Sequence, residues 1–246
     1  MEKLAVVTGS SGSLGIAIVD RFKRAGYLIC GLDITRATKS NVDFFIEVDL
    51  NEFVLNETTR KKVILKIKKW TKKEFIRTII NNAAYQFVSD KHPIDILEIS
   101  KSYNINVVAP YILTTHLANL ISPKIGCVVN VGSIHSRLTK PGFLAYSITK
   151  SALSALTRAL AIDYQNLFRI NCIEPAAIDT AMLLQGFNGN KDKFKNLENC
   201  HPQKRISTTS EIAEMIYLIN SKNIRFLHGA SIDMSGGISG RLNDPV

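Results

Sequence analysis

The sequence lacks the features that mark membrane proteins and metal proteins. Its four cysteines include no Cys-x-x-Cys pair, which argues against the common zinc and redox motifs, so we expect no metal site. The first apolar run, at residues 4–7, is too short for the core of a signal peptide, and no stretch approaches the length of a membrane span. We therefore expect a cytoplasmic protein with no membrane partner and with reduced, mostly buried thiols.

Acidic residues are fewer than basic ones, 21 against 31, which gives a net charge of +10. Much of the positive charge lies in residues 60–73 (RKKVILKIKKWTKK) and raises the question of a nucleic-acid partner. However, Val63, Ile64, Ile67 and Trp70 recur at helical spacing, which leaves the lysines on the opposite face. This pattern is typical of an ordinary amphipathic helix, and we expect no nucleic-acid partner.

The chain also lacks internal repeats, low-complexity tracts and proline-rich linkers, so residues 1–246 are expected to form a single domain. Short apolar runs alternate with longer helical patterns. Continuous rather than alternating apolar runs are typical of strands covered by helices on both faces. The sequence therefore predicts an α/β fold, a doubly wound (Rossmann) parallel sheet of seven strands, at residues 4–8, 28–33, 44–49, 75–81, 127–133, 169–174 and 231–234.

A glycine-rich turn, TGSSGSLG, follows the first expected strand. Gly9, Gly12 and Gly15 permit a sharp turn and the approach of backbone N–H groups to a pyrophosphate at a helix N-terminus. Asp33 ends the second expected strand, where its carboxylate can accept hydrogen bonds from both ribose hydroxyls and repel a 2′-phosphate. These residues predict a dinucleotide site that favours NAD over NADP, although Arg36 could recruit that phosphate.

Three residues later in the chain have the chemistry of a proton-transfer site. Tyr146 and Lys150 are four residues apart on one expected helix, so an ammonium would lie beside a phenol and lower its pKa from about 10. Ser133 ends the apolar run before that helix, at the edge where open α/β sheets bind ligands. A Tyr-x-x-x-Lys pair is common by chance, so it carries weight only together with Ser133, the glycine-rich turn and NNAA at residues 81–84.

Taken together, these motifs resemble the short, single-domain branch of the short-chain dehydrogenase/reductase family, from residue 4 to about residue 237. The turn departs from that branch, because TGxxxGxG would put glycine where Ser13 stands. The resemblance implies catalysis by Ser133, Tyr146 and Lys150, with Asn106 supporting a proton relay. It also implies that Tyr146 and Lys150 contact the cofactor together with Gly9, Ser11, Gly12, Ser13, Leu14, Gly15, Asp33, Asp49, Leu50, Asn82, Ala83, Ala84, Pro175, Ile178 and Thr180.

Some assignments stay open at this level. Asp49 matches the family position that contacts adenine, but it also suits a helix N-cap. His135 and Arg137 follow Ser133 closely and either line the substrate pocket or belong to a solvated loop. Residues 181–205, which we call the substrate segment, form a polar stretch with scattered apolar residues and are expected to form a substrate loop.

The sequence thus predicts an NAD(H)-dependent oxidoreductase that interconverts an alcohol and a carbonyl on a small-molecule substrate bound by Ser133, His135 and Tyr146. The alternative is a non-catalytic dinucleotide-sensing protein on the same fold. Residues 106–120 and 152–162 are apolar around most of their circumference, which predicts a homodimer or homotetramer formed through these two helices.

Overall fold

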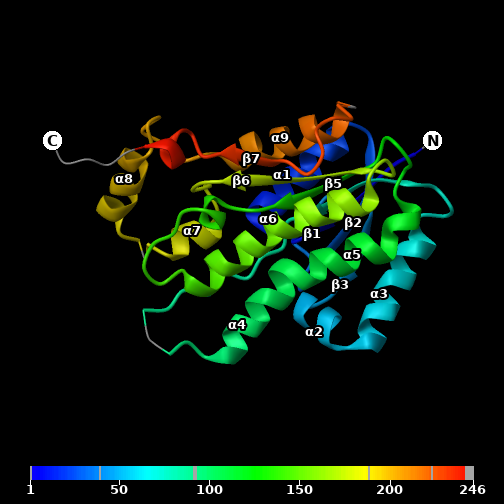
Figure 1. The fold of residues 1–246 in the computed structure, drawn as a ribbon, viewed down its shortest axis with the longest axis horizontal. Helices are drawn as coiled ribbons and strands as arrows, with labels where there is room; N and C mark the ends of the chain where they lie inside the picture. Colours follow the sequence, from blue (N-terminus) through cyan, green and yellow to red (C-terminus); the bar gives the residue numbers. More distant parts are fainter. Residues whose placement is uncertain (1, 39, 91–92, 188, 223, 242–246) are drawn as a thin grey trace.

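The computed structural model describes residues 2–38, 40–90, 93–187, 189–222 and 224–241. All seven strands are parallel and form one sheet in the order β3-β2-β1-β4-β5-β6-β7. This confirms the expected doubly wound sheet (Figure 1). The strands are β1 (Lys3–Thr8), β2 (Tyr27–Asp33), β3 (Phe44–Glu47), β4 (Ile76–Asn81), β5 (Cys127–Val131), β6 (Arg169–Pro175) and β7 (Ser231–Met234).

Helices cover both faces of the sheet and give it two apolar cores. On one face, α1 (Ser13–Arg24) and α9 (Thr209–Ser221) pack side by side and contribute Ile18, Phe22 and Ile216. On the other face, α2 (Leu50–Leu55), α3 (Glu57–Trp70), α5 (Ala109–Leu117) and α6 (Leu144–Tyr164) contribute residues such as Phe53 and Leu113. Burial on both faces explains why the strands are continuously apolar.

The basic helix expected within residues 60–73 is α3. Val63, Ile64 and Ile67 are buried, while most of its lysines are exposed. Its charge therefore belongs to the solvated face of an amphipathic helix, as expected.

Two strands end earlier than the sequence suggested. β3 ends at Glu47 because Asp49 leaves the strand to cap α2, accepting a hydrogen bond from Asn51 N at 2.7 Å. β5 ends at Val131, and Gly132 follows in very close contact with β6. A Cβ on Gly132 would lie 2.6 Å from Cys172 Sγ and 2.9 Å from Ile173 O, so only glycine fits there.

The strand order reverses between β1 and β4, where β1 and β4 are neighbours although two strands intervene in the chain. Ligands of open α/β sheets bind at the carboxyl ends of the strands beside such a reversal. The glycine-rich turn after β1 and the NNAA segment after β4 both lie at that edge.

The substrate segment is partly helical, which the sequence did not predict. It contains α7 (Ala181–Gln185) and α8 (Lys191–Cys200), which lie at the left of Figure 1, away from the N-terminus. Residue 188 of the segment lies outside the described residues. Thr180 and Asn190 start these helices by accepting backbone N–H groups, which explains why a polar sequence forms helix there.

The cysteines are as expected: Cys30, Cys127 and Cys172 are buried in strands, and all four are unpaired. Burial raises the pKa of the Cys127 thiol to about 11 and that of the Cys172 thiol to about 12. In the part of the chain that the structure describes, no helix is both long and apolar enough to cross a bilayer.

Candidate active site

The glycine-rich turn joins β1 to α1 at the carboxyl edge of the sheet. Gly9 has a φ of +64°, and a Cβ on it would lie 2.8 Å from Asn82 Nδ2, while a Cβ on Gly15 would lie 1.9 Å from Gly9 O. Both positions therefore require glycine. A Cβ on Gly12 would make only an ordinary contact, 3.7 Å from Gly9 O. Gly12 is the N-cap of α1 without a side-chain cap, so the first N–H groups of the helix are available to an anion.

Hydrogen bonds lock the NNAA segment to this turn. The Thr8 hydroxyl accepts from the backbone N–H groups of Asn82 and Ala83, each at 3.0 Å. Asn82 Nδ2 in turn donates to the carbonyls of Thr8 and Gly9, also at 3.0 Å. This role of Thr8 was not predicted from the sequence. Its position directly before Gly9, in the glycine-rich turn, could have indicated it. Ala84 follows in the same half-buried segment.

Asp33 lies at the end of β2 beside the turn, as predicted. Its carboxylate accepts from Ser11 N at 2.8 Å and from Ile34 N at 2.8 Å, which fixes its orientation. Arg36 turns away from it, with its guanidinium 3.4 Å from Val42 O and 5.9 Å from the centre of the Phe45 ring. The cation that argued for a 2′-phosphate therefore lies against β3 and not at Asp33.

The N-cap role of Asp49 is confirmed by its bond to Asn51 N, and Leu50 is buried as the first residue of α2. The N-cap bond uses Oδ1 of Asp49 only, so it does not exclude a contact with adenine. Contact of these two residues with adenine remains a prediction.

Ser133 follows Gly132 at the end of β5 and starts the short turn before α6. It is nearly buried, and its hydroxyl accepts from His135 N at 3.2 Å. Tyr146, on the first turn of α6, is also nearly buried and lies against Ser133. Burial raises the pKa of Tyr146 to about 12, and the Ser133 hydroxyl opposes this rise.

Lys150 lies one helical turn after Tyr146, with Nζ 5.4 Å from the centre of the phenol ring. It is buried, and Nζ donates to Val131 O at 2.7 Å. Burial lowers the pKa of Lys150 to about 8, and nearby Cys172 opposes this change. Our expectation that Lys150 would hold the pKa of Tyr146 below its usual range is wrong for the structure as it stands, because desolvation of the phenol dominates.

Asn106 lies in a π-helical turn (Asn104–Val108) between α4 (Ile96–Tyr103) and α5. Its side-chain oxygen accepts from Tyr85 N at 2.7 Å, and its Nδ2 donates to Tyr85 O at 2.9 Å and to Thr149 Oγ1 at 3.0 Å. Such turns are frequent at functional sites. Asn106 thus ties the segment after β4 to the helix of Tyr146 and Lys150.

His135 lies beside Tyr146 in a small aromatic cluster. Its ring stacks on Phe143 with centroids 4.6 Å apart, and its edge contacts Tyr146 at 5.7 Å. Burial, together with nearby Lys140, lowers the pKa of His135 to about 4, so the imidazole is neutral at pH 7. His135 is thus half-buried beside Tyr146 and is not a solvated loop residue, while its place in a substrate pocket remains a prediction.

Arg137 has a different role. Its guanidinium lies 3.1 Å from the carboxylates of both Glu174, at the end of β6, and Asp233, in β7. Glu174 is almost fully buried. Arg137 therefore holds the loop after Ser133 against two neighbouring strands, and no sequence motif indicated this network.

The segment after β6 approaches the glycine-rich turn. Pro175 ends β6, Ile178 pairs with Ser207 in an isolated bridge, and Thr180 caps α7 through Leu183 N at 3.3 Å. The hydroxyl of Ser13 accepts from Ala181 N at 3.1 Å. Ser13, the departure from the usual turn, thus connects the start of α1 to the start of α7, and Leu14 is buried just behind it.

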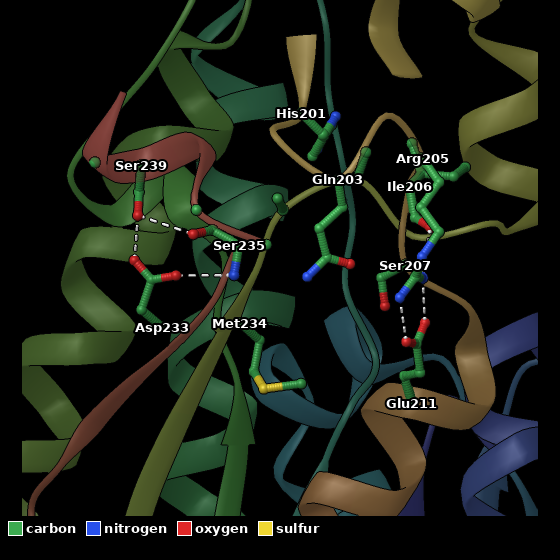
Figure 2. A pocket seen from close by; sticks show the side chains of 15 residues that line it. His201, Gln203, Arg205, Ile206, Ser207, Glu211, Asp233, Met234, Ser235 and Ser239 are labelled. Carbon is green, nitrogen blue, oxygen red and sulfur yellow. Dashed lines mark hydrogen bonds and ion pairs between the residues drawn. The ribbon is translucent and has the colours of Figure 1, made fainter. Parts of the chain in front are cut away.

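A cavity of about 490 Å³ lies behind this segment, beside Ala176 and Ala177. Figure 2 shows that its charged groups are paired: Arg205 donates to both oxygens of Glu211, at 2.8 and 2.7 Å, and Asp233 accepts from Ser235 N and Ser239. The bonds from Arg205 hold the pKa of Glu211 at about 2. Because its charged groups are paired within the protein, we assign this cavity a structural role beside the site and not a ligand-binding role.

Among the described residues, no cluster of histidine, cysteine or carboxylate side chains is suited to a metal ion. The donor set at the carboxyl edge instead suits a dinucleotide: N–H groups at the start of α1 that no side chain caps, an oriented carboxylate at Asp33, and a lysine and tyrosine farther along the edge.

Comparison with known proteins agrees with this reading. The model of a family described as enoyl-(acyl carrier protein) reductase matches residues 9–239. The aldohexose dehydrogenase of Thermoplasma acidophilum superposes with a TM-score of 0.91 at 25% identity, covering 100% of this chain and 97% of that one.

Two further solved structures share the fold over 98% of this chain and 100% of their own. ElxO, solved with NADP bound, has a TM-score of 0.84 at 21% identity. A 4-hydroxyisoleucine dehydrogenase complexed with NADH has a TM-score of 0.86 at 23% identity. On the family match, the fold and the geometry at the carboxyl edge, the chain belongs to the short-chain dehydrogenase/reductase family of oxidoreductases.

Proposed function

We propose that this protein is an NAD(H)-dependent enzyme that interconverts an alcohol and a carbonyl. The observation that carries the proposal is the placement of Ser133, Tyr146 and Lys150. All three are nearly or fully buried, and they follow one another from β5 into α6 at the edge that also holds the glycine-rich turn and Asp33. A nicotinamide dinucleotide would supply or accept the hydride there.

The chain's own residues would position the substrate and move the proton. In the reductive direction the Ser133 hydroxyl donates to the substrate carbonyl oxygen, and Tyr146 gives that oxygen its phenolic proton. A pKa of about 12 keeps Tyr146 protonated at neutral pH, as a proton donor requires. Lys150, with a pKa of about 8, is mostly charged at pH 7 and stabilises the phenolate left behind.

The cofactor would lie along the carboxyl edge. Its pyrophosphate is assigned to the turn from Gly9 to Gly15, its adenosine ribose to Asp33, and its nicotinamide end to Lys150 and the segment from Pro175 to Thr180. The carboxylate of Asp33 and the withdrawal of Arg36 support NAD as the preferred cofactor. The unpaired, buried thiols favour a reducing compartment, and we propose a cytoplasmic location.

The surroundings of Tyr146 favour a neutral substrate. His135 is uncharged at pH 7, and Arg137 is occupied by two carboxylates, so neither presents a free cation to an anionic group. The similarity to an aldohexose dehydrogenase makes aldohexoses the first compounds to test, and the family description makes acyl thioesters the second.

The test compares Tyr146→Phe with Tyr103→Phe, a control at the exposed last residue of α4. NADH binding is measured by calorimetry, and turnover is measured with NAD and a panel of sugars, polyols and other alcohols. We expect unchanged NADH binding in both variants and at least about a 100-fold loss of turnover in Tyr146→Phe alone. NADH binding without turnover of any compound would favour the dinucleotide-sensing alternative, and absence of dinucleotide binding would refute both.

A further inference from the structure

A second cavity lies at the opposite edge of the sheet from the candidate active site. Its volume is about 660 Å³. It is lined by residues that precede or begin β5, β6 and β7, whereas Ser133 and the cofactor residues follow the other ends of the strands. The lining residues are Lys124, Gln165, Asn166, Phe168, Arg169, Arg225, Phe226 and His228.

The charges of this cavity are all positive. Lys124, Arg169 and Arg225 line it, and no carboxylate does. Within the described ranges, none of these three cations lies within 4.0 Å of an acidic oxygen. The cavity of Figure 2, in contrast, pairs its arginine with a glutamate. Unpaired cations around one concave surface create a positive potential that attracts anions.

Arg169, which lines this cavity, carries buried donors. The residue is only 3% exposed, and one of its nitrogens donates to Ile219 O at 2.8 Å at the end of α9. Its other two nitrogens, Nε and the remaining terminal nitrogen, are buried without an acceptor in the described part of the chain. Buried donors without an acceptor are costly, so this side of the guanidinium favours a hydrogen-bond acceptor nearby.

His228 adds another donor. The backbone N–H of Ile170 donates to its Nδ1 at 3.0 Å, so the neutral imidazole carries its proton on Nε2. That Nε2 is also buried without an acceptor among the residues described. The cavity therefore combines positive charge with N–H groups that lack a partner, and it lacks carboxylates.

Two phenylalanines complete the cavity. Phe168 is buried, but the side chain of Phe226 is fully exposed, at 102% of its reference area. A large apolar ring held in solvent beside a cationic cavity offers a contact surface for a flat or apolar group.

We propose that this cavity binds the phosphate group of a small phosphorylated molecule whose aromatic or apolar part packs on Phe226. A phosphate dianion matches several cations and accepts several hydrogen bonds at once, and guanidinium groups bind it with two parallel bonds. The site lies apart from Tyr146 and Asp33, so the proposal does not depend on the oxidoreductase activity.

The test measures binding of phenyl phosphate and of inorganic phosphate by calorimetry. The site variant is Lys124→Gln with Arg225→Gln, both exposed, and the matched control is Lys62→Gln with Lys66→Gln on the exposed face of α3. Any phosphate bound at the glycine-rich turn is the same in both proteins, so the difference isolates the cavity. We expect the site variant to bind both ligands at least about tenfold more weakly than the wild type. The control should bind them with unchanged affinity.

A third variant, Phe226→Ala, tests the aromatic contact. We expect it to weaken phenyl phosphate severalfold while inorganic phosphate binds as in the wild type. Equal affinity of all variants for both ligands would mean that phosphate binds elsewhere and would overturn the proposal. So would the absence of measurable binding of phenyl phosphate at about 10 mM, a concentration that detects even weak complexes.

Discussion

Asn106 Nδ2 donates to Thr149 Oγ1 at 3.0 Å, and this bond joins the π-helical turn to α6 one residue before Lys150. The same amide pairs with both backbone groups of Tyr85. One buried side chain thus fixes the segment after β4 relative to the helix that holds Tyr146 and Lys150.

We therefore expect Asn106→Ala to cost about 1–3 kcal/mol of unfolding free energy, because it leaves Tyr85 N–H and its carbonyl without partners. Turnover should fall while NADH binding is largely kept. Urea unfolding and steady-state kinetics measure the two effects. The control is Asn104→Ala on the same turn, which removes only a half-buried bond to Asn51. Equal losses in both variants would argue against a special role for Asn106.

The buried ammonium of Lys150 should make stability depend on pH. Its pKa is about 8 in the folded protein and about 10.5 in the unfolded chain. Between these values the unfolded state binds more protons, so this group makes the folded state more stable as pH rises from about 8 to about 10.5. Urea unfolding over this range should show that the unfolding free energy of the wild type rises relative to that of Lys150→Met as pH increases. A constant difference would mean that the ammonium is solvated.

Asp33 should set the cofactor preference. We expect wild type to bind NAD more tightly than NADP, and Asp33→Ala to reduce that ratio by about tenfold, because it removes repulsion of the 2′-phosphate. Titration of both cofactors measures the ratio, with Glu57→Ala, an exposed carboxylate on α3, as the control. Tighter NADP binding by wild type would show that Arg36 moves to the phosphate.

The apolar faces of α5 and α6 should hold copies of the chain together. Ile162 is 73% exposed at the end of α6, and Tyr111 is 46% exposed on α5. We expect light scattering to give a multiple of the 27.3 kDa chain mass. Ile162→Glu should shift the population toward monomer, whereas Leu65→Glu, on an exposed position of α3, should not. A monomeric wild type would refute the expected dimer or tetramer.

Most of the fold could be predicted from the sequence, because apolar runs and glycines report directly on backbone geometry. Gly9 and Gly15 are required by contacts below 3.0 Å, and the strand that ends in Asp33 was predicted to the residue at its carboxyl end. The proximity of Ser133, Tyr146 and Lys150 to one another could be predicted, because Tyr146 and Lys150 have helical spacing and Ser133 follows a strand at the carboxyl edge of a parallel sheet.

The rest depends on tertiary packing that no local pattern encodes. The pKa of Tyr146 is set by how completely the phenol is buried and not by its separation from Lys150 along the helix. Similarly, Arg137 follows Ser133 by four residues, yet it contacts Glu174 and Asp233, which come from two later strands. The π-helical turn at Asn106 also gave no signal, because nothing in its residues (NINVV) distinguishes the wider π-helical hydrogen bonding from that of an ordinary helix.

The distribution of the thiols permits selective labelling of the native protein. Cys30, Cys127 and Cys172 are sealed in the sheet, while Cys200 is exposed at the last residue of α8, within the substrate segment. A maleimide dye added to the native protein would therefore attach at that one position without any engineered substitution. The unaltered chain thus carries its own labelling site for following, by fluorescence, how the substrate segment responds when dinucleotide or substrate is added.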